Sequence, residues 1–400
     1  MLSKKSPQLR FKGFTDDWED RNLKDILREF STKSKIENEY RVLSSTNVGM
    51  EFRDGRVSGT SNLGYKIIKN GDLVLSPQNL WLGNININNI GTGLVSPSYK
   101  TFNFTDIDSS FIKPQLRTPK MLEEYKNSST QGASVVRRNL EIDSFYQIKI
   151  ATPSIKEQEK IGSFFKHLDS TISLHQRKLD LLKEQKKGYL QKMFPKNGEK
   201  VPELRFAGFV DDWEERKLGD ISYKVKEKNK TGEFTETLTN SAEYGIINQR
   251  DFFDKDISNA KNLTGYYVVK NDDFVYNPRI SNFAPVGPIK RNKLGRTGVM
   301  SPLYYVFRTH DIDKNYFEKY FDTVYWHRFM ELNGDSGARA DRFAIKDSVF
   351  VEMPIPYPTM DEQQKIGSFF QQLDNTIALH QLKLDLLKEQ KKGFLQKMFA

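Results

Sequence analysis

The stretch from residue 161 to residue 195 reads IGSFFKHLDSTISLHQRKLDLLKEQKKGYLQKMFP. It returns at 366–400 as IGSFFQQLDNTIALHQLKLDLLKEQKKGFLQKMFA, with an offset of 205 residues. The two copies agree at 28 of 35 positions. A duplication this long and this close predicts a chain built from two related halves.

A second duplicated motif, the leading motif, lies near the start of each half, upstream of the long repeated segment. It reads PQLRFKGFTDDWEDRNLKDI at 7–26 and PELRFAGFVDDWEERKLGDI at 202–221. The blocks between the duplicated segments differ much more, although TGLVSPSYKTF at 92–102 still echoes TGVMSPLYYVF at 297–307. Nearly identical frames around divergent blocks predict one fold that carries two different recognition surfaces.

Each of the segments 161–195 and 366–400 carries an apolar heptad pattern over about four heptads, which predicts a long helix. Ser154 with Glu157 and Thr359 with Glu362 form S/T-x-x-E patterns, which predict capping boxes at the helix starts. Because neither apolar stripe can remain in water, we expect the two helices to pair, and the repeat makes the pair antiparallel. The predicted seam consists of Leu168, Ile172, His175, Leu179, Leu182, Tyr189, Met193, Leu373, Ile377, His380, Leu384, Leu387, Phe394 and Met398.

Two residue types inside the predicted helices leave alternatives open. His175 and His380 fall on the seam, either as packed core residues or as a proton-sensitive switch. Gly188 and Gly393 each cost about 1 kcal/mol against alanine, so they indicate a kink or a close approach of another element.

The variable blocks combine strand and helix signals. YKIIKNGDLVLS at 65–76 and YYVVKNDDFVYN at 266–277 read as strand, tight turn and strand. The predicted fold class is therefore α+β, with two pseudo-two-fold related α+β domains separated by two long antiparallel helices that form a coiled coil. The expected boundaries are 1–154, 155–195, 196–359 and 360–400.

Composition limits the function. The chain has 62 basic and 52 acidic residues, a net charge of +10, and no cysteine. The positive balance favours an anionic partner such as nucleic acid, and the lack of cysteine excludes a disulfide scaffold and a cysteine nucleophile. The five histidines show no metal-binding spacing, so we expect no metal.

Signals for catalysis and for membranes are absent from the sequence. There is no phosphate-binding G-x-x-x-x-G-K-[ST] and no dinucleotide-binding G-x-G-x-x-G, so no cofactor is expected. A lone E-x-K at 124–126 has no preceding P-D pair and does not make a nuclease site. No apolar run reaches about 18 residues and the start lacks an apolar signal core, so we expect a cytoplasmic protein with no membrane partner.

Candidate nucleic-acid contacts gather at turns of the variable blocks. Arginine reads guanine and Gln or Asn reads adenine, whereas clustered cations suit phosphates. The run from 290 to 296 holds four cations and no acid, which predicts a phosphate contact, with a solvated charged turn as the alternative. The candidates are Arg53, Arg56, Gln78, Asn79, Arg137, Arg138, Arg250, Arg279, Lys290, Arg291, Lys293, Arg296, Arg339 and Arg342.

Over essentially its whole length the chain resembles the specificity subunit of bacterial type I restriction–modification systems. The resemblance rests on EQEKIGSFFKHLDSTI and EQQKIGSFFQQLDNTI, on the LRFxGFxDDWExR motifs, and on the YLQKMF and FLQKMF ends. It implies two target-recognition domains, each reading one half of a split sequence in double-stranded DNA. It also implies that the helices set the spacing and dock methyltransferase subunits, two in number, and that restriction subunits join the full complex.

The family resemblance implies a non-catalytic subunit whose partners carry the chemistry. One alternative is a self-contained enzyme that modifies or cleaves DNA at an unrecognised active site. Another is a coiled-coil scaffold with no role on DNA. Modification or cleavage of DNA by the purified chain alone would support the first alternative. A chain that does not bind DNA would support the second.

Overall fold

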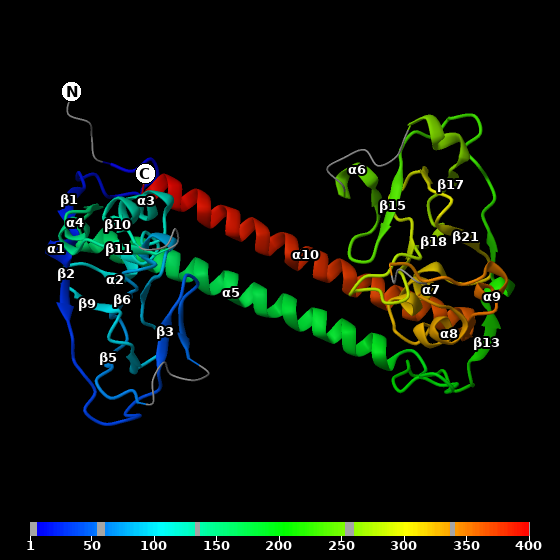
Figure 1. Ribbon diagram of the computed structural model, residues 1–400, viewed down its shortest axis with the longest axis horizontal. Coiled ribbons are helices and arrows are strands. Elements are labelled where there is room, and N and C mark those ends of the chain that lie inside the picture. The colour runs from blue at the N-terminus through cyan, green and yellow to red at the C-terminus, as the bar shows by residue number, and fades with distance from the viewer. Residues whose placement is uncertain (1–5, 54–60, 133–136, 253–259, 337–340, 400) are drawn as a thin grey trace. The chain divides into compact units, whose positions relative to one another are not determined.

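The structure is a computed structural model that describes residues 6–53, 61–132, 137–252, 260–336 and 341–399 (Figure 1). The chain forms two compact units: Met1–Arg177 with Leu382–Ala400, and Lys178–Gln381. The predicted long helices are α5 (Ile155–Lys192) and α10 (Met360–Met398). The boundaries expected from the sequence give each long helix a segment of its own, 155–195 and 360–400. In the structure, each helix contributes one end to each unit.

The first unit is organised around a four-stranded antiparallel sheet with the order β2-β9-β6-β7. Four antiparallel two-stranded ladders, β1-β12, β3-β4, β5-β8 and β10-β11, accompany it. The strands are β1 (Glu19–Asn22), β2 (Leu27–Phe30), β3 (Leu43–Ser45), β4 (Met50–Phe52), β5 (Lys66–Ile68), β6 (Leu73–Leu75), β7 (Ile85–Ile87), β8 (Gly93–Val95), β9 (Lys100–Phe104), β10 (Ser129–Gln131), β11 (Arg138–Leu140) and β12 (Lys149–Thr152). The short helices are α1 (Leu23–Ile26), η1 (Leu80–Leu82), α2 (Ser109–Ile112), α3 (Pro119–Asn127) and α4 (Ile142–Tyr146).

The second unit repeats this plan with the sheet order β14-β21-β18-β19. The ladders β13-β22, β15-β16 and β17-β20 correspond to β1-β12, β3-β4 and β5-β8. The strands are β13 (Glu214–Lys217), β14 (Ser222–Lys224), β15 (Leu238–Ser241), β16 (Gly245–Asn248), β17 (Tyr267–Val269), β18 (Phe274–Tyr276), β19 (Ile289–Arg291), β20 (Gly298–Met300), β21 (Tyr305–Thr309) and β22 (Pro354–Tyr357). The short helices are η2 (Leu218–Asp220), α6 (Gln249–Phe252), η3 (Ala260–Gly265), α7 (Lys314–Phe321), α8 (His327–Asn333) and α9 (Asp347–Phe350).

The core of each unit includes the ends of both long helices. In the first unit Ile161 and Phe165 of α5 and Met398 of α10 pack with buried strand residues such as Phe102. In the second unit the corresponding helix residues are Ile366, Phe370 and Met193. The duplicated apolar positions therefore anchor each variable block to the helices.

Within each unit, α5 and α10 lie side by side and antiparallel. In the first unit Asp169 forms an ion pair with Lys391 at 2.7 Å, and the Phe164 and Phe394 rings are 5.0 Å apart. Every predicted seam residue on the two helices is buried or half-buried. The contacts of the second unit are Asp374–Lys186 at 2.7 Å and Phe369–Tyr189, with ring centres 5.1 Å apart.

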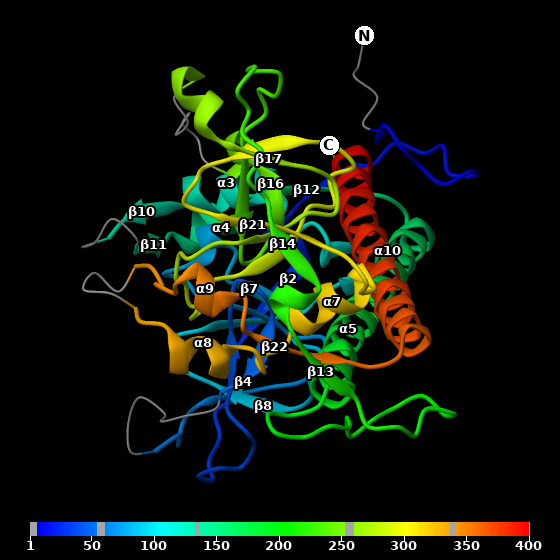
Figure 2. The ribbon, with the colours of Figure 1, turned by 90° about the vertical axis from the view of Figure 1, so that its right-hand side faces the viewer.

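Two duplicated glycines let short helices approach the long ones. A Cβ at Gly162 would lie 1.9 Å from Ser110 Oγ of α2, and one at Gly367 would lie 2.6 Å from Asp313 Oδ1 at the start of α7. Figure 2, in which the second unit faces the viewer, shows α7 beside α10. Glycine at these positions is a packing requirement.

The other two helical glycines behave differently. A Cβ at Gly188 or Gly393 would meet no atom within 4 Å. The close approach that the sequence suggested there is wrong, and α5 and α10 continue through both positions.

The predicted capping boxes form only in part. The Glu362 backbone N–H donates to Thr359 Oγ1 at 3.4 Å, as a capping threonine requires. The Glu157 and Glu362 carboxylates instead point into the protein and bind arginines of the duplicated leading motifs. The prediction was wrong for the acidic half of each box, because tertiary charge pairing outcompetes the local backbone contact.

Candidate nucleic-acid interface

Two equivalent turns carry candidate base-reading side chains. Strand β6 is followed by Pro77-Gln78, and strand β18 by Pro278-Arg279, at the same place in the two sheets. The Gln78 and Arg279 side chains are exposed, and Asn79 is half-buried. The Arg279 backbone N–H donates to Asn277 Oδ1 at 3.0 Å, which fixes the turn.

A second segment runs alongside each turn. In the second unit Arg279 and Arg342 are bridge partners, and the Phe343 N–H donates to the Pro278 carbonyl at 2.7 Å. In the first unit the Arg138 N–H donates to the Gln78 carbonyl at 3.3 Å. The exposed residues Arg279 and Arg342 thus come together although 63 positions separate them.

Arg342 also stands at the edge of a cavity of about 840 Å³ in the second unit. Tyr276, Tyr305 and Phe350 supply its aromatic side, and Lys346 adds a second cation. Burial raises the pKa of Tyr305 to about 12, so this phenol stays neutral at physiological pH. Asp335 and Asp347 also line the cavity, so its two cations are matched by two carboxylates beside the aromatic surface.

Further exposed arginines follow equivalent hairpins. Arg53 comes directly after β4, and its N–H donates to the Val42 carbonyl at 3.0 Å. Arg250 lies in α6, directly after β16, where the Gln249 N–H donates to the Thr237 carbonyl at 2.8 Å. Arg137, directly before β11, is also exposed. Arg56 and Arg339 lie outside the described residues.

One candidate arginine has a structural role. The Arg138 guanidinium donates to Ser129 Oγ at 3.0 Å, to the Ser129 carbonyl at 2.7 Å and to the Lys126 carbonyl at 3.3 Å. These bonds tie strand β11 to the end of α3. A guanidinium held in this way is occupied by the protein itself, so we withdraw Arg138 as a base reader.

The phosphate contact predicted for residues 290–296 is not supported. All four cations bind carboxylates that come from distant parts of the second unit, so the loop has little free positive charge. Residues 290–296 contain no acidic residue, and folding brings the carboxylates to these cations from elsewhere in the chain. The pairs are Lys290–Asp322 at 2.9 Å, Arg291–Asp272 at 2.6 Å, Lys293–Glu318 at 3.1 Å and Arg296–Glu236 at 2.7 Å.

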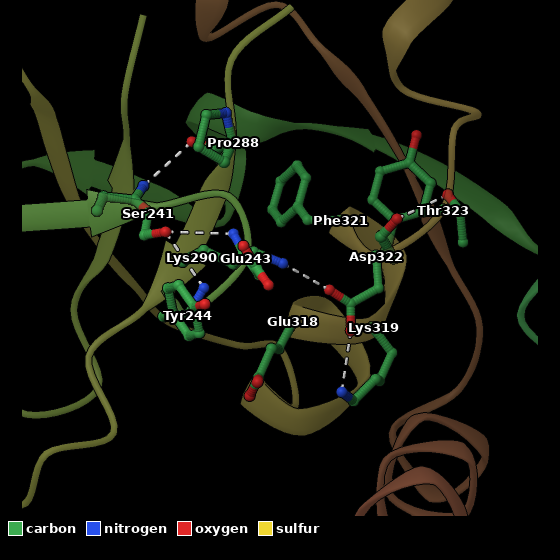
Figure 3. A network of polar contacts seen from close by, with 12 residues as sticks. Ser241, Glu243, Tyr244, Pro288, Lys290, Glu318, Lys319, Phe321, Asp322 and Thr323 are labelled. Carbon is green, nitrogen blue, oxygen red and sulfur yellow. Dashed lines mark hydrogen bonds and ion pairs between the residues drawn. The ribbon is translucent and has the colours of Figure 1, made fainter. Parts of the chain in front are cut away.

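Lys290 belongs to a larger ion network (Figure 3). Asp322 accepts from Lys290 at 2.9 Å and from Lys319 at 3.0 Å, and Lys319 also binds Asp374 of α10 at 2.7 Å. Burial alone would raise the pKa of Asp322, but the charges of Lys319 and Lys290 outweigh it and hold that pKa well below its usual range. Burial alone would lower the pKa of Lys319, but the charges of Asp322 and Asp374 outweigh burial and raise that pKa. The network fastens α7 to α10 within the second unit.

The first unit contains a cation that the sequence analysis missed. The Arg117 guanidinium is half-buried and donates to the carbonyls of Gly83 at 3.1 Å and Val48 at 3.0 Å, and also to the Asn86 side chain. These acceptors are all neutral, and burial lowers the pKa of Arg117. Nothing in the local sequence distinguishes this arginine, because its neutral partners come from two other segments, 46–48 and 83–86.

Sequence comparison then identifies the family. Residues 15–184 and 210–389 match the sequence profile of the type I restriction modification DNA specificity domain. The chain belongs to this family. The two matched ranges coincide with the two duplicated halves, so each half is one specificity domain.

Individual relatives are more distant. The type I restriction enzyme MjaVIII specificity subunit of Methanocaldococcus jannaschii is 23% identical over 297 residues, covering 69% of this chain and 66% of that protein. A putative MjaX specificity subunit of the same organism is 24% identical, covering 62% of this chain and 57% of that protein. The matches thus span less than two thirds of the length of these relatives.

Solved structures share the fold. The type I restriction–modification S subunit of M. genitalium aligns with a TM-score of 0.59 at 13% identity, covering 99% of both chains. A chain from a structural study of type I complex assembly and conformational transition aligns with a TM-score of 0.51 at 14% identity, over 98% of this chain and 99% of the other.

Among the described residues, no cluster of three or more histidine and carboxylate side chains offers a metal site. None of the helices in the same ranges is long and apolar enough to cross a membrane.

Proposed function

We propose that the chain is the sequence-specific DNA-recognition subunit of a type I restriction–modification complex, and that each unit reads one half of a bipartite target. One observation supports this proposal: equivalent turns in the two units carry different exposed side chains, both of types that can contact bases. Gln78 lies three residues after the end of β6, and Arg279 lies three residues after the end of β18. Two copies of one fold with different residues at one reading position suit two different half-sites.

We assign base reading to the exposed side chains at these turns and hairpins. Gln78 and Asn79 suit adenine, and an arginine suits guanine through two hydrogen bonds to its O6 and N7 atoms. The remaining proposed readers are Arg53, Arg137, Arg250, Arg279 and Arg342, and Arg56 and Arg339, which lie outside the described residues, are proposed on their sequence alone.

We further propose that α5 and α10 form a coiled-coil spacer that docks methyltransferase subunits. Each helix leaves two leucines, seven residues apart, in solvent: Leu174 and Leu181 are 61% and 52% exposed, and Leu379 and Leu386 are 67% and 49% exposed. These pairs are copies of each other in the duplicated segments. Identical apolar pairs on two helices support the binding of two copies of one partner, while restriction subunits would join the full complex.

A domain exchange tests this function. Residues 27–150 are replaced by the corresponding block of another specificity subunit, and the methylated sites are mapped in a host that carries the methyltransferase subunits. We expect one half of the target to change and the half read by 222–352 to persist. A change in both halves contradicts the modular assignment.

A control addresses the chemistry. The purified chain alone, supplied with methyl donor and DNA, should not modify DNA, because we assign methyl transfer to the partner subunits. Modification by the chain alone would favour the self-contained enzyme.

A further inference from the structure

The two copies of the long helix differ mainly along one stripe. Only seven of the 35 duplicated positions differ, and four of the seven are spaced by 4, 3 and 4 residues. At about 100° per residue, these four lie within about 60° of one another on the helix surface. On α5 they are Lys166, Ser170, Ser173 and Arg177, and on α10 they are Gln371, Asn375, Ala378 and Leu382.

The α5 stripe lines a groove within the first unit. The groove encloses about 490 Å³, and all four stripe residues border it. Ser109, Ser110 and Lys113 form part of its other wall. Divergence between the helix copies is thus concentrated where α5 faces this groove.

The cations of the groove are not neutralised by the protein. Lys113, Lys166 and Arg177 are exposed, and the side chain of none of them forms a hydrogen bond or ion pair with another described residue. The carboxylate that lines the groove is Asp169, which already pairs with Lys391 at 2.7 Å. The groove therefore carries a net positive charge, supported by four serine hydroxyls.

The equivalent place in the second unit lacks this free positive charge. Asp108 and Asp313 hold matching positions, since their N–H groups donate to Gln158 and Gln363 at 3.0 and 2.9 Å. Five residues after each aspartate comes Lys113 in the first unit but Glu318 in the second. Glu318 binds Lys293 at 3.1 Å, so an acid replaces the free cation.

A neighbouring cavity extends the positive surface. It encloses about 360 Å³, shares Lys113 and Asp169 with the groove, and includes Arg117. The groups that accept hydrogen bonds from Arg117 are all neutral. A half-buried cation without a carboxylate partner is costly unless an anion approaches from outside.

We infer that this groove binds the phosphate backbone of DNA and gives the first unit a phosphate anchor that the second unit lacks. The inference rests on the proposed function and deepens it. Lysine, arginine and serine are the side chains that contact phosphates, and such contacts carry no sequence information. A protein partner would favour an apolar, charge-depleted centre, which the stripe does not provide.

The test replaces the α5 stripe by the residues that the chain itself places on α10: K166Q, S170N, S173A and R177L. These residues suit the helix, since Leu382, the counterpart of Arg177, is 67% exposed on α10. DNA affinity of the full chain with its methyltransferase subunits is measured over a salt series. Loss of two phosphate contacts should make the slope of log K against log salt shallower by about 1.8. The ratio of specific to non-specific affinity should stay the same.

The matched control removes two cations from α5 away from the stripe, by Lys178→Gln and Lys183→Leu, and should leave the slope unchanged. An unchanged slope in the stripe variant, or an equal change in the control, overturns the inference. Loss of methyltransferase assembly with unchanged DNA binding also overturns it, because a protein would then occupy the groove. Absence of sequence preference in the unaltered complex would count instead against the proposed function.

Discussion

Arg205 of the second leading motif holds the carboxylate of Glu362, at the start of α10, by two parallel hydrogen bonds of 2.7 and 2.8 Å. The Glu362 side chain is fully buried, and Arg205 is 12% exposed. Arg10 and Glu157 form the same pair in the first unit, at 2.7 and 2.8 Å. The pairs explain why LRF and EQ are duplicated together: each fixes a leading motif to the start of a long helix.

The two copies differ in one hydrogen bond, which gives a first prediction. Trp213 Nε1 donates to Glu362 at 3.1 Å, whereas Trp18 Nε1 is buried and has no partner among the described residues. A hydrogen bond to a charged group contributes about 1.5–3 kcal/mol. Trp213→Phe should therefore lower the free energy of unfolding by that much more than Trp18→Phe does. Urea unfolding of both variants measures the difference, and equal losses would contradict it.

A second prediction concerns the open helical glycines. Gly188→Ala and Gly393→Ala should each stabilise the protein by about 1 kcal/mol, because alanine favours helix and the added Cβ meets nothing. Gly162→Ala is the control and should destabilise, since its Cβ would clash with Ser110. Thermal unfolding tests the signs. Destabilisation at position 188 would reveal a role for that glycine beyond the helix.

The buried ion network gives a prediction on pH. Asp322→Asn leaves Lys319, which is 6% exposed, with one aspartate fewer, and should cost about 3 kcal/mol at pH 7. Because the pKa values of Asp322 and Asp374 are lowered by folding, their stabilisation is complete above the ordinary aspartate range and is lost as the pH falls through the lowered values. The pKa of Lys319 is raised, so its contribution persists through neutral pH and is lost only at high pH.

Urea unfolding between pH 3 and pH 7 provides the measurement. The stability gap between the Asp322→Asn variant and the unaltered chain should narrow as the pH falls. A gap that stays constant over this range would mean that the charge of Asp322 is not what stabilises the unit.

A fourth prediction separates reading from charge. Arg279→Ala should lower discrimination at one base pair of the second half-site by about 1–3 kcal/mol. Lys293→Ala should change neither discrimination nor salt dependence, because Glu318 already neutralises Lys293. Binding to a panel of single-base target variants measures both. Sequence-selective loss from Lys293→Ala would show that its ion pair opens on DNA.

The last prediction concerns the spacer. Insertion of one heptad after Leu182 and one after Leu387 keeps the seam in register and adds about 10.5 Å to each helix. That length corresponds to about three base pairs and about 100° of DNA rotation. The native target should be lost, and surviving methylation should move to a longer spacer with unchanged half-sites. Insertion of two residues should break the seam and reduce stability. Full activity on the original spacer would mean that the methyltransferase partners set the distance.

The sequence by itself determined the repeated plan of this protein. Duplication at 161–195 and 366–400 identified both long helices, because a heptad pattern is local and periodic. The same duplicated motifs indicated the specificity-domain family, which the sequence comparison confirms. Turn residues such as Pro77 and Pro278 also placed Gln78 and Arg279 at strand ends, because turn chemistry is local as well.

Only the tertiary structure decided which charged side chains already have a partner within the protein. Lys290 and Arg296 seemed free in a run without acids, yet Asp322 and Glu236 reach them from positions 32 and 60 residues away. Lys166 lies on α5, in a segment that the sequence marked only as a repeat. In the structure its side chain borders an open groove and has no partner among the described residues. Coulomb attraction depends on distance in space and on burial, and neither follows from order along the chain.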